Sequence, residues 1–410
     1  MTSVIGSVTA PSPAHDAVHY RELELLLLCA RTALTESEVT QIRALVEQGI
    51  DWTTVVEQAA LHGVNPLLHV SLRHTCPNLV PREFMEQIQG RFAINALRNL
   101  RRSGELVRLL SACTAQGILA VPIKGPVLAA QVYGDVALRE FVDLDLLVHP
   151  SDLDRAGSVL RDQGYTQGAS SRAAEEITFT REDGRDMVEI HAHLVAHWQL
   201  RRSFALEFDA LRPRLASVTL AGNRSVPTLS PEDLLLVLCV HGCSHHWSRL
   251  SWIADVAEML RAPSRIDWKV LLTRARELGC ERMVLLGLRL ASDLLDAELP
   301  IEVRERIHMC PTLSRLAEQV IGWLFSEYHH AIGLSEEAAF FVASRERWRD
   351  RLPYLDLFAR AWLKAALKPT QKDRDWVSLP DSLAIGYFFI RPLRIAYGYI
   401  AELAKRVESG

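Results

Sequence analysis

The stretch from Ile123 to His149 decides the fold, and it reads IKGPVLAAQVYGDVALREFVDLDLLVH. Asp143 and Asp145 stand two residues apart in its apolar second half, so an extended chain projects both carboxylates from one face. The apolar side chains around them are expected to fill the opposite face: Val142, Leu144 and Leu146. Two adjacent anions repel each other, and such a pair usually persists because it binds a divalent cation, with Mg²⁺ as the first candidate and Mn²⁺ as the second.

A third carboxylate stands on a later segment with the same alternation. The segment Met187–Leu194 reads MVEIHAHL, which predicts a strand with one apolar face. Glu189, His191 and His193 share its other face. If this strand lies beside the first acidic strand, three oxygen ligands converge. Three carboxylates around Mg²⁺, with open positions for phosphate oxygens, suit in-line nucleotidyl or phosphoryl transfer.

The order of these features resembles the polymerase-beta nucleotidyltransferase superfamily, in which a small-residue turn, paired acids and a distal acid follow one another. More narrowly, the chain resembles the bacterial uncharacterised nucleotidyltransferase family, over most of its length. The motifs that carry the resemblance are Ile123-Lys124-Gly125, Arg139, Asp143 to Val148, Gly164-Tyr165, Val188 to His191, Ser230 to Asp233, His241-Gly242, Leu250-Ser251-Trp252 and Arg391-Pro392. The resemblance implies an α+β fold, with a small mixed-sheet core between all-helical regions. It also implies a nucleoside triphosphate, ATP first, as co-substrate.

The resemblance also implies roles for single residues at the acidic site. Asp143, Asp145 and Glu189 would form the catalytic set and hold the metal. Glu189 would complete the site and act as a base. His191 lies beside the expected metal pocket, where it would support the cofactor or handle a proton, although a hydrogen-bonded structural histidine is the simpler interpretation.

The phosphate side departs from the superfamily pattern. The usual Gly-Ser or Gly-Gly turn is Gly125-Pro126 here, which removes a hydroxyl and a backbone N–H that could reach phosphate. Lys124 and Gly125 would approach the triphosphate, with Arg139 as a secondary candidate, and the two cations would replace the lost donors with charge. Either cation is equally well explained as a surface charge or a structural ion-pair partner. The departure leaves a second function open: a catalytically retired scaffold or regulatory protein that keeps the fold.

The histidines permit a rival chemistry on paper. Two groups could be drawn as a zinc site: His191, His193 and His197, and His241, His245 and His246. The chain has neither a Cys-x-x-Cys nor a His-Glu-x-x-His spacing, so structural histidines are the preferred interpretation. Gly242-Cys243-Ser244 faintly resembles a nucleophile elbow, but it lacks the second glycine and lies in a helical pattern.

The composition is typical of an intracellular enzyme. The chain has 410 residues, 49% of them hydrophobic and 23% charged, which is enough for packed cores in two or three domains. Its seven cysteines form no paired framework and are expected to be reduced, and we expect neither a secretory signal nor a membrane span. The protein is therefore predicted to be cytoplasmic. A net charge of −4 makes a nucleic acid an unlikely partner, so the acceptor is expected to be a small molecule, a sugar or a peptide.

Four regions are predicted along the chain: a flexible tail (1–20), an N-terminal helical region (21–110), a nucleotidyltransferase core (111–228) and a C-terminal helical domain (229–410). The core should contain a helix that begins at Pro126 and a helix opened by Ser151. Its expected strands are Leu119–Ile123, Phe141–Val148, Glu176–Thr180 and Met187–Leu194.

Capping signals mark several helices outside the core. Thr35 to Glu38 has the form of a capping box, and Ser230 precedes a proline and two acids. Ile50-Asp51-Trp52 recurs as Ile266-Asp267-Trp268, each followed by a glycine at identical spacing. A shared way of capping a helix explains this recurrence more simply than an internal duplication.

Overall fold

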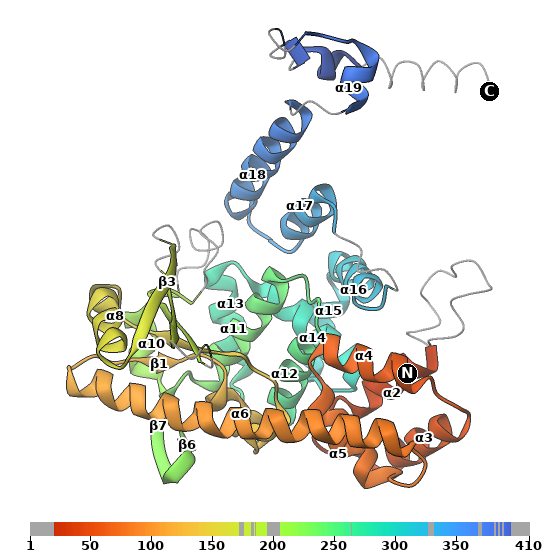
Figure 1. Ribbon diagram of the computed structural model, residues 1–410, viewed down its shortest axis with the longest axis vertical. Helices are drawn as coiled ribbons and strands as arrows, with labels where there is room; N and C mark the ends of the chain where they lie inside the picture. Colours follow the sequence, from red (N-terminus) through yellow and green to blue (C-terminus); the bar gives the residue numbers. More distant parts are fainter. Residues whose placement is uncertain are drawn as a thin grey trace. The chain divides into compact units, whose positions relative to one another are not determined.

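A five-stranded mixed sheet contains the acidic strand (Figure 1). Its order is β1-β2-β5-β4-β3, with β2 and β5 parallel and the other neighbours antiparallel. The strands span Val121–Pro122 (β1), Asp143–Leu147 (β2), Tyr165–Ser171 (β3), Glu176–Arg181 (β4) and Met187–His191 (β5). The parallel pair places the two acidic strands side by side, and the fold is α+β as predicted.

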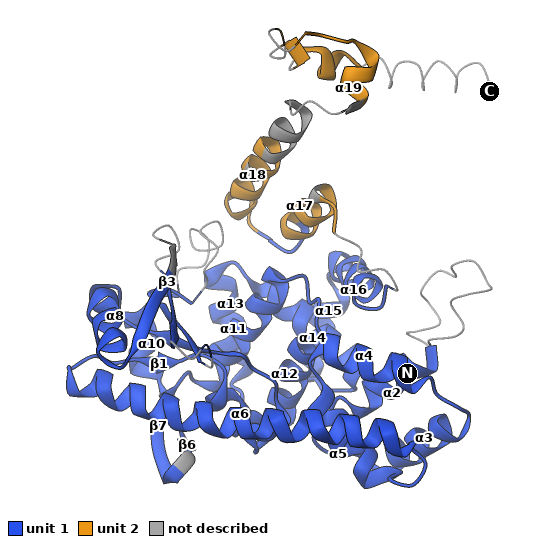
Figure 2. Ribbon diagram, viewed as in Figure 1, with its two compact units in different colours: residues 1–330, 343–346 blue, residues 331–342, 347–410 orange. Residues whose placement is uncertain are grey.

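The structure is a computed structural model of this chain. It describes residues 20–171, 176–181, 184, 186–194, 206–263, 265–326, 332–367, 371–380, 383, 386, 387 and 389–394. The chain divides into two compact units, residues 1–330 with 343–346 and residues 331–342 with 347–410 (Figure 2). Apart from its last residue, the expected tail of residues 1–20 lies outside the described residues.

The four predicted strands of the core are present, but three of them are shorter, and β3 was not predicted. β1 covers two residues, β2 begins at Asp143 rather than Phe141, and β5 ends at His191 rather than Leu194. The expectation that Val142 fills the inner face is wrong, because its side chain is 66% exposed. It precedes the first residue pair that joins β2 to β5, so the sheet does not cover it.

One face of the sheet packs against helices α6 (Arg82–Ala115) and α8 (Leu153–Asp162). Leu144 and Leu146 of β2 contribute to this core, each 1% exposed. Since successive strand residues point to opposite faces, the residues between and beside them project from the other face, Asp145 among them. The core therefore fixes which way the acidic side chains point.

The connection from β1 to β2 begins with a turn that requires glycine. Gly125 has φ 60° and ψ −129°, a conformation that residues with a Cβ rarely adopt. The predicted helix begins at Pro126, as α7 (Pro126–Leu128), and continues as a π-helical turn over Ala129–Tyr133. A 3₁₀ turn over Val136–Leu138 then leads to β2.

The remaining elements of the first unit are mostly helices, on both sides of the core in sequence. Those before it are α2 (Tyr20–Cys29), α3 (Glu36–Glu47), α4 (Trp52–His62) and α5 (Asn65–Thr75). Those after it are α10 (Phe208–Leu211), α11 (Pro231–Ser244), α12 (Leu250–Arg261), α13 (Trp268–Leu278), α14 (Glu281–Leu295), α15 (Ile301–His308) and α16 (Pro311–Leu324). A hairpin of β6 (Ala216–Leu220) and β7 (Arg224–Thr228), which the sequence did not predict, precedes α11. The capping box at Thr35 and the N-cap at Ser230 are both confirmed.

The two recurring segments share more than a cap. Asp51 caps α4 and Asp267 caps α13, and each helix ends at its glycine, with φ 67° and 68°. The backbone N–H of each aspartate also donates to a glutamate in the first turn of an earlier helix. Asp51 donates to Glu22 at 2.9 Å, and Asp267 donates to Glu232 at 3.0 Å. This additional contact favours a repeated helical unit over a shared cap alone.

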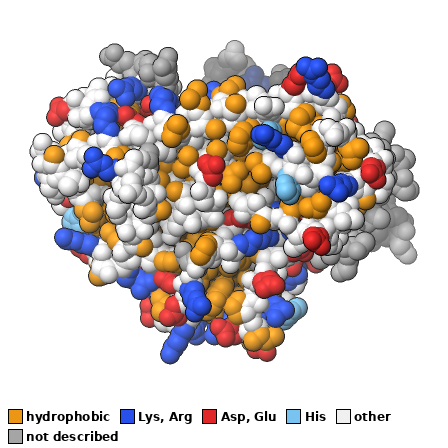
Figure 3. All heavy atoms as spheres, turned by 90° about the horizontal axis from the view of Figure 1, so that it is seen from below, with side chains coloured by type: hydrophobic (Ala, Val, Ile, Leu, Met, Phe, Trp, Pro, Cys, Tyr) orange, Lys and Arg blue, Asp and Glu red, His pale blue; other side chains and the backbone are white. Residues whose placement is uncertain are grey.

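Helix α6 exposes apolar side chains along its middle. Ile94, Leu97 and Leu100 are 53%, 71% and 58% exposed. The face seen from below, where α6 runs in Figure 1, mixes hydrophobic, acidic and basic side chains (Figure 3). A polynucleotide-binding face would be more uniformly basic. None of the helices that the structure describes is both long and apolar enough to cross a membrane.

The second unit contains α17 (Leu334–Ala343), α18 (Trp348–Leu367) and α19 (Gln371–Trp376). Phe341 stacks on Tyr354, with ring centroids 5.1 Å apart. The buried carboxylate of Asp373 accepts hydrogen bonds from Arg391 at 3.2 Å and from Arg394 at 2.6 Å. The first contact joins α17 to α18, and the second joins α19 to residues 391–394.

Candidate active site

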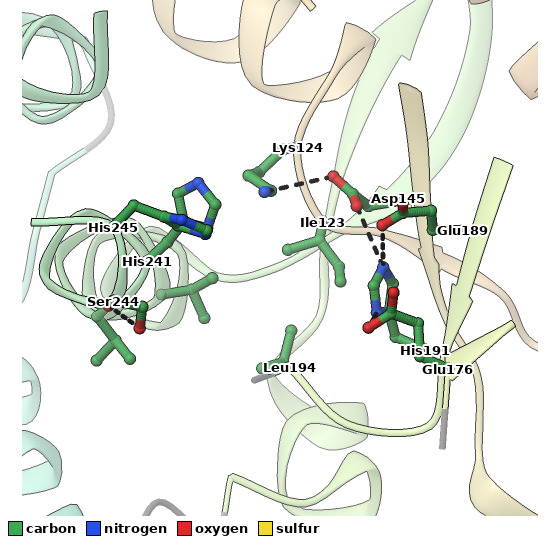
Figure 4. A pocket seen from close by; sticks show the side chains of 12 residues that line it. Ile123, Lys124, Asp145, Glu176, Glu189, His191, Leu194, His241, Ser244 and His245 are labelled. Atoms are coloured by element: carbon green, nitrogen blue, oxygen red, sulfur yellow. Dashed lines mark hydrogen bonds and ion pairs between the residues drawn. The ribbon is translucent and has the colours of Figure 1, made fainter. Parts of the chain in front are cut away.

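Asp145 and Glu189 are register partners on the parallel strands β2 and β5. One ligand atom from each of Asp145, Glu189 and His191 can be chosen so that all three lie within 4.8 Å of one another. Figure 4 shows these side chains converging at one end of a cavity. The structure thus brings together two of the three predicted acids, and it adds His191 to them.

His191 lies among three carboxylates. Its Nε2 is 3.1 Å from Oδ1 of Asp145 and 3.6 Å from Oε2 of Glu189, and its Nδ1 is 3.6 Å from Oε2 of Glu176. Burial lowers the pKa of His191, but the hydrogen bond with Asp145 and the surrounding negative charge raise it above the ordinary value overall. The ring is therefore held by the acidic cluster rather than by the apolar core.

Asp143 is not a member of this cluster. It pairs in register with Met187, and the two residues of strand that separate it from Asp145 correspond to about 6.6 Å. Burial and the charge of Asp145 raise its pKa, although Lys124 and Arg139 act in the opposite direction. Asp143 therefore interacts with the cluster electrostatically, from a position two residues before Asp145 on β2.

Lys124 places a cation beside the cluster, with its Nζ 3.5 Å from Oδ2 of Asp145. Burial alone would raise the pKa of Asp145, but Lys124 and His191 hold it well below its usual range. Burial and the charge of Asp145 raise the pKa of Glu189 to about 7. One carboxylate is thus firmly ionised while its neighbour titrates near neutral pH, an arrangement that is common at functional sites.

A cavity of about 250 Å³ separates the cluster from helix α11. The sheet side of the cavity carries the acids and Lys124, and the helix side carries one face of α11 (Figure 4). The residues of α11 and its C-cap that line it are spaced as successive turns of a helix bring them to one face: Val237, Val240, His241, Ser244 and His245. The cavity is therefore apolar near one end of this helix face and polar near the other.

The family described as "Uncharacterised nucleotidyltransferase" matches residues 48–296, a range that includes the sheet, the cluster and α11. The chain belongs to this nucleotidyltransferase family. Among solved structures, an antigenic nucleotidyltransferase-like protein from Paracoccidioides brasiliensis is similar to it at 17% identity and a TM-score of 0.31. That similarity covers 49% of this chain and 94% of the other. No curated protein matches the sequence.

In this member of the nucleotidyltransferase family, Arg139 is engaged away from the cavity. Its guanidinium donates to both carboxylate oxygens of Asp255 in α12, from Nε at 2.8 Å and from Nη2 at 2.9 Å. Tyr133 donates its hydroxyl to the same carboxylate at 2.7 Å. Asp255 is 1% exposed, so the structure favours the interpretation of Arg139 as a structural ion-pair partner.

The donor set fits a divalent cation. Two carboxylates and an imidazole are oxygen and nitrogen ligands that suit Mn²⁺ and, through the carboxylates, Mg²⁺. Lys124 beside Asp145 partly neutralises the site before any cation binds. The imidazole is the one donor that the metal set predicted from the sequence did not include.

The described histidines do not gather into either of the zinc sites drawn from the sequence. Within the described part of the chain, the group with metal-ligand spacing is the acidic one that includes His191. His241 and His245 instead pack together, with ring centroids 4.6 Å apart, and both contact Trp252. His197 lies outside the described residues.

The sequence did not show that Glu176, or the pair His241 and His245, would line the cavity. Glu176 belonged to a predicted strand, but its pairing with His191 across β4 and β5 could not be read from the pattern. His241 and His245 were assigned no role at this site. Their i, i+4 spacing on a predicted helix was the available signal, but nothing local indicated that this face turns toward the acids.

Proposed function

We propose that this protein is a Mg²⁺-dependent nucleotidyltransferase, which moves a nucleoside monophosphate from a nucleoside triphosphate to an acceptor. The observation that carries the proposal is the register pairing of Asp145 with Glu189 beside a cavity that also contains Lys124. Membership of the family supports the reaction class. ATP is the first donor to test, and Mn²⁺ the alternative metal. The acceptor would be a small molecule, a sugar or a peptide with a hydroxyl or related nucleophile.

In the reaction that we infer, an acceptor oxygen forms a bond to the α-phosphorus, and the bond from that phosphorus to the oxygen bridging to the β-phosphate breaks. Pyrophosphate leaves, and the acceptor proton passes to a base. Glu189 is the candidate base, because its carboxylate lines the cavity in register with Asp145.

Holding the cation would fall to Asp145, Glu189 and His191, with Asp143 as a further candidate one step along β2. When bound, the cation supplies positive charge that neutralises phosphate oxygens and the leaving pyrophosphate. Asp145 suits this task because it is ionised and only 8% exposed, so its charge acts where little water screens it.

Contact with the triphosphate would fall to Lys124 and Gly125. Lys124 lies on the cavity wall, two residues beyond the end of β1, and it presents a point charge beside Asp145. Gly125 directly follows Lys124 in the turn, whose backbone conformation requires a residue without a Cβ. Arg139 would act through charge alone, since its guanidinium donates to Asp255.

Glu189→Gln tests whether the protein is an enzyme. Nucleotide affinity should change little, whereas transfer should slow about a hundredfold or more, the usual scale for loss of a general base. The assay follows pyrophosphate release from labelled triphosphates, with cell extract supplying acceptors. Glu176→Gln is the matched control, because it removes a carboxylate from the same cavity without removing a member of the metal cluster. Equal background rates for wild type and Glu189→Gln, with nucleotide bound by both, would reject the catalytic proposal.

One observation favours the alternative of a non-catalytic scaffold or regulatory protein. Pro126 follows the turn glycine directly and has no N–H to offer to phosphate. A protein of this kind would bind nucleotide through Lys124 and the metal cluster without turnover. The Glu189→Gln comparison separates the two functions, because only an enzyme has a rate of nucleotidyl transfer that the substitution can lower.

A further inference from the structure

The Gly125-Pro126 turn offers fewer hydrogen-bond donors than a bound triphosphate requires. A triphosphate carries several negative charges, which backbone N–H groups and cationic side chains can meet. Here Pro126 removes one N–H, and Arg139 is committed to Asp255. Among the described residues that line the sheet side of the cavity, Lys124 is the one lysine or arginine. Further donors must come from another wall.

Helix α11 forms that wall. His241 and His245 line the cavity opposite the acids, on the same helix face as Ser244 (Figure 4). The electrostatic surroundings of His241 include Lys124, His245 and Asp145, so its ring lies within the field of the site. Burial, with Lys124 and His245 adding to it, holds the pKa of His241 well below the ordinary value. The imidazole is therefore neutral and offers one N–H donor.

The end of α11 is held rigidly. Trp247, fully buried, donates its backbone N–H to the carbonyl of Gly242 at 2.8 Å, and its ring fills the space beside that glycine, where a Cβ would lie 2.5 Å from it. His246 and Trp247 both have positive φ, 56° and 53°. Such conformations cost free energy in residues with a Cβ and persist where the surrounding structure imposes them, often at functional sites.

Aromatic packing fixes the two rings themselves. His241 and His245 contact Trp252 of α12, with ring centroids 5.4 Å and 5.3 Å away. The guanidinium of Arg249 lies over the same indole, 6.0 Å from its centroid. The wall is thus preorganised to offer N–H groups to an anion.

We propose that His241 and His245 bind the phosphate oxygens of the donor triphosphate, in place of the donors missing from the Gly125-Pro126 turn. The inference rests on the proposed function, because it concerns the same nucleotide site. The triphosphate would lie between the two walls, with the metal cluster and Lys124 on one side and the two imidazoles on the other. The histidines would thereby distinguish a triphosphate from a monophosphate.

The test compares full-length variants that keep or lose the donor. His241→Leu with His245→Leu removes both N–H groups, whereas His241→Gln with His245→Gln keeps an amide donor on each side chain. Calorimetry with Mg²⁺ measures binding of ATP, AMP and inorganic pyrophosphate. The leucine pair should weaken ATP and pyrophosphate binding about tenfold or more, with AMP binding almost unchanged, and the glutamine pair should keep most of the affinity. His74→Leu, at an exposed position of α5, is the control.

Each outcome has a distinct meaning. Equal ATP affinity in wild type and the leucine pair overturns the inference and leaves the proposed function standing. Wild type that binds neither ATP nor pyrophosphate in Mg²⁺ overturns both. If the leucine pair does not fold, His245→Ala decides, because this exposed position tolerates truncation. If the ratio of ATP affinity to AMP affinity in that variant equals the wild-type ratio, phosphate binding is rejected in favour of a packing role.

Discussion

The carboxylates of Asp145 and Glu189 face one another from adjacent parallel strands, in register, with His191 within hydrogen-bonding distance of Asp145. Asp143 belongs to the same strand but meets Met187. The two acids of the Asp-Leu-Asp motif are therefore not equivalent: one is inside the cluster and the other is beside it. This difference can be measured.

We expect Asp145→Asn to weaken Mn²⁺ binding about a hundredfold or more, whereas Asp143→Asn should weaken it less than about tenfold. The reason is that Asp145 supplies a ligand atom to the cluster, and even the loss of an outer hydrogen-bond partner of a ligand costs ~10–100-fold in metal affinity. Electron paramagnetic resonance of free Mn²⁺ measures both variants. Similar losses for the two would place Asp143 in the metal set.

Arg139→Leu should destabilise the protein by about 3–5 kcal/mol, the cost of removing one partner of a buried ion pair. Asp255, 1% exposed in the intact protein, would lose both guanidinium hydrogen bonds, while the hydroxyl of Tyr133 would still donate to it. Urea unfolding measures the change. The double variant Arg139→Leu with Asp255→Leu is the control, and it should recover part of the loss because no charge is left unpaired. Full stability combined with lost ATP affinity would instead make Arg139 a phosphate ligand.

The alternation of apolar and acidic residues was sufficient to predict both acidic strands and the face from which Asp145 and Glu189 project. A pattern that repeats every two residues reports local strand geometry only. The site also required that the two strands pair with each other. The partner of Arg139 could not be predicted in this way, because Asp255 lies 116 residues further along the chain on a different helix. The exposure of Val142 was missed for a related reason, since a pattern does not show where pairing begins.

The α11 wall shows the same limit. His241 and His245 were visible as a helical pair, but the side on which α11 packs depends on tertiary contacts such as the ring of Trp247 against Gly242 and Gly287. Those contacts join residues that no local period relates. The sequence therefore predicted the acidic half of the candidate site and left out the half that faces it.

Gly242→Ala should destabilise the protein by about 1–3 kcal/mol, the usual cost of overpacking a filled core. The added Cβ would lie 2.5 Å from the fully buried ring of Trp247, which would have to move together with the end of α11. Gly104→Ala in α6 is the matched control, because a Cβ added there would meet no heavy atom within 4 Å, and alanine should stabilise the helix by about 0.5–1 kcal/mol. Thermal unfolding of both variants measures the contrast, and equal shifts would contradict the packing that holds α11.

Glu105 makes part of the stability depend on pH. Its carboxylate accepts hydrogen bonds from Arg108 at 2.5 Å and from Tyr165 at 2.6 Å, and it forms an ion pair with Arg181 at 3.1 Å. Burial raises the pKa of Glu105, but the hydrogen bonds from Arg108 and Tyr165 and the charges of the two arginines lower it below the ordinary 4.5 overall. A lowered pKa in the folded state contributes stability above the unfolded value, and this is lost as the pH falls through the folded value.

Glu105→Gln should therefore cost about 1–2 kcal/mol near pH 7, and this difference from wild type should shrink steadily below about pH 4.5. Urea unfolding at about pH 7, 5 and 3.5 measures the difference. Glu86→Gln, on the same helix, is the control. Its partner Arg82 is 91% exposed, so the loss of this surface pair should leave stability unchanged at each of these pH values. A Glu105→Gln effect that stayed constant down to about pH 3.5 would mean that packing, rather than the charge of the carboxylate, stabilises this contact between α6 and the sheet.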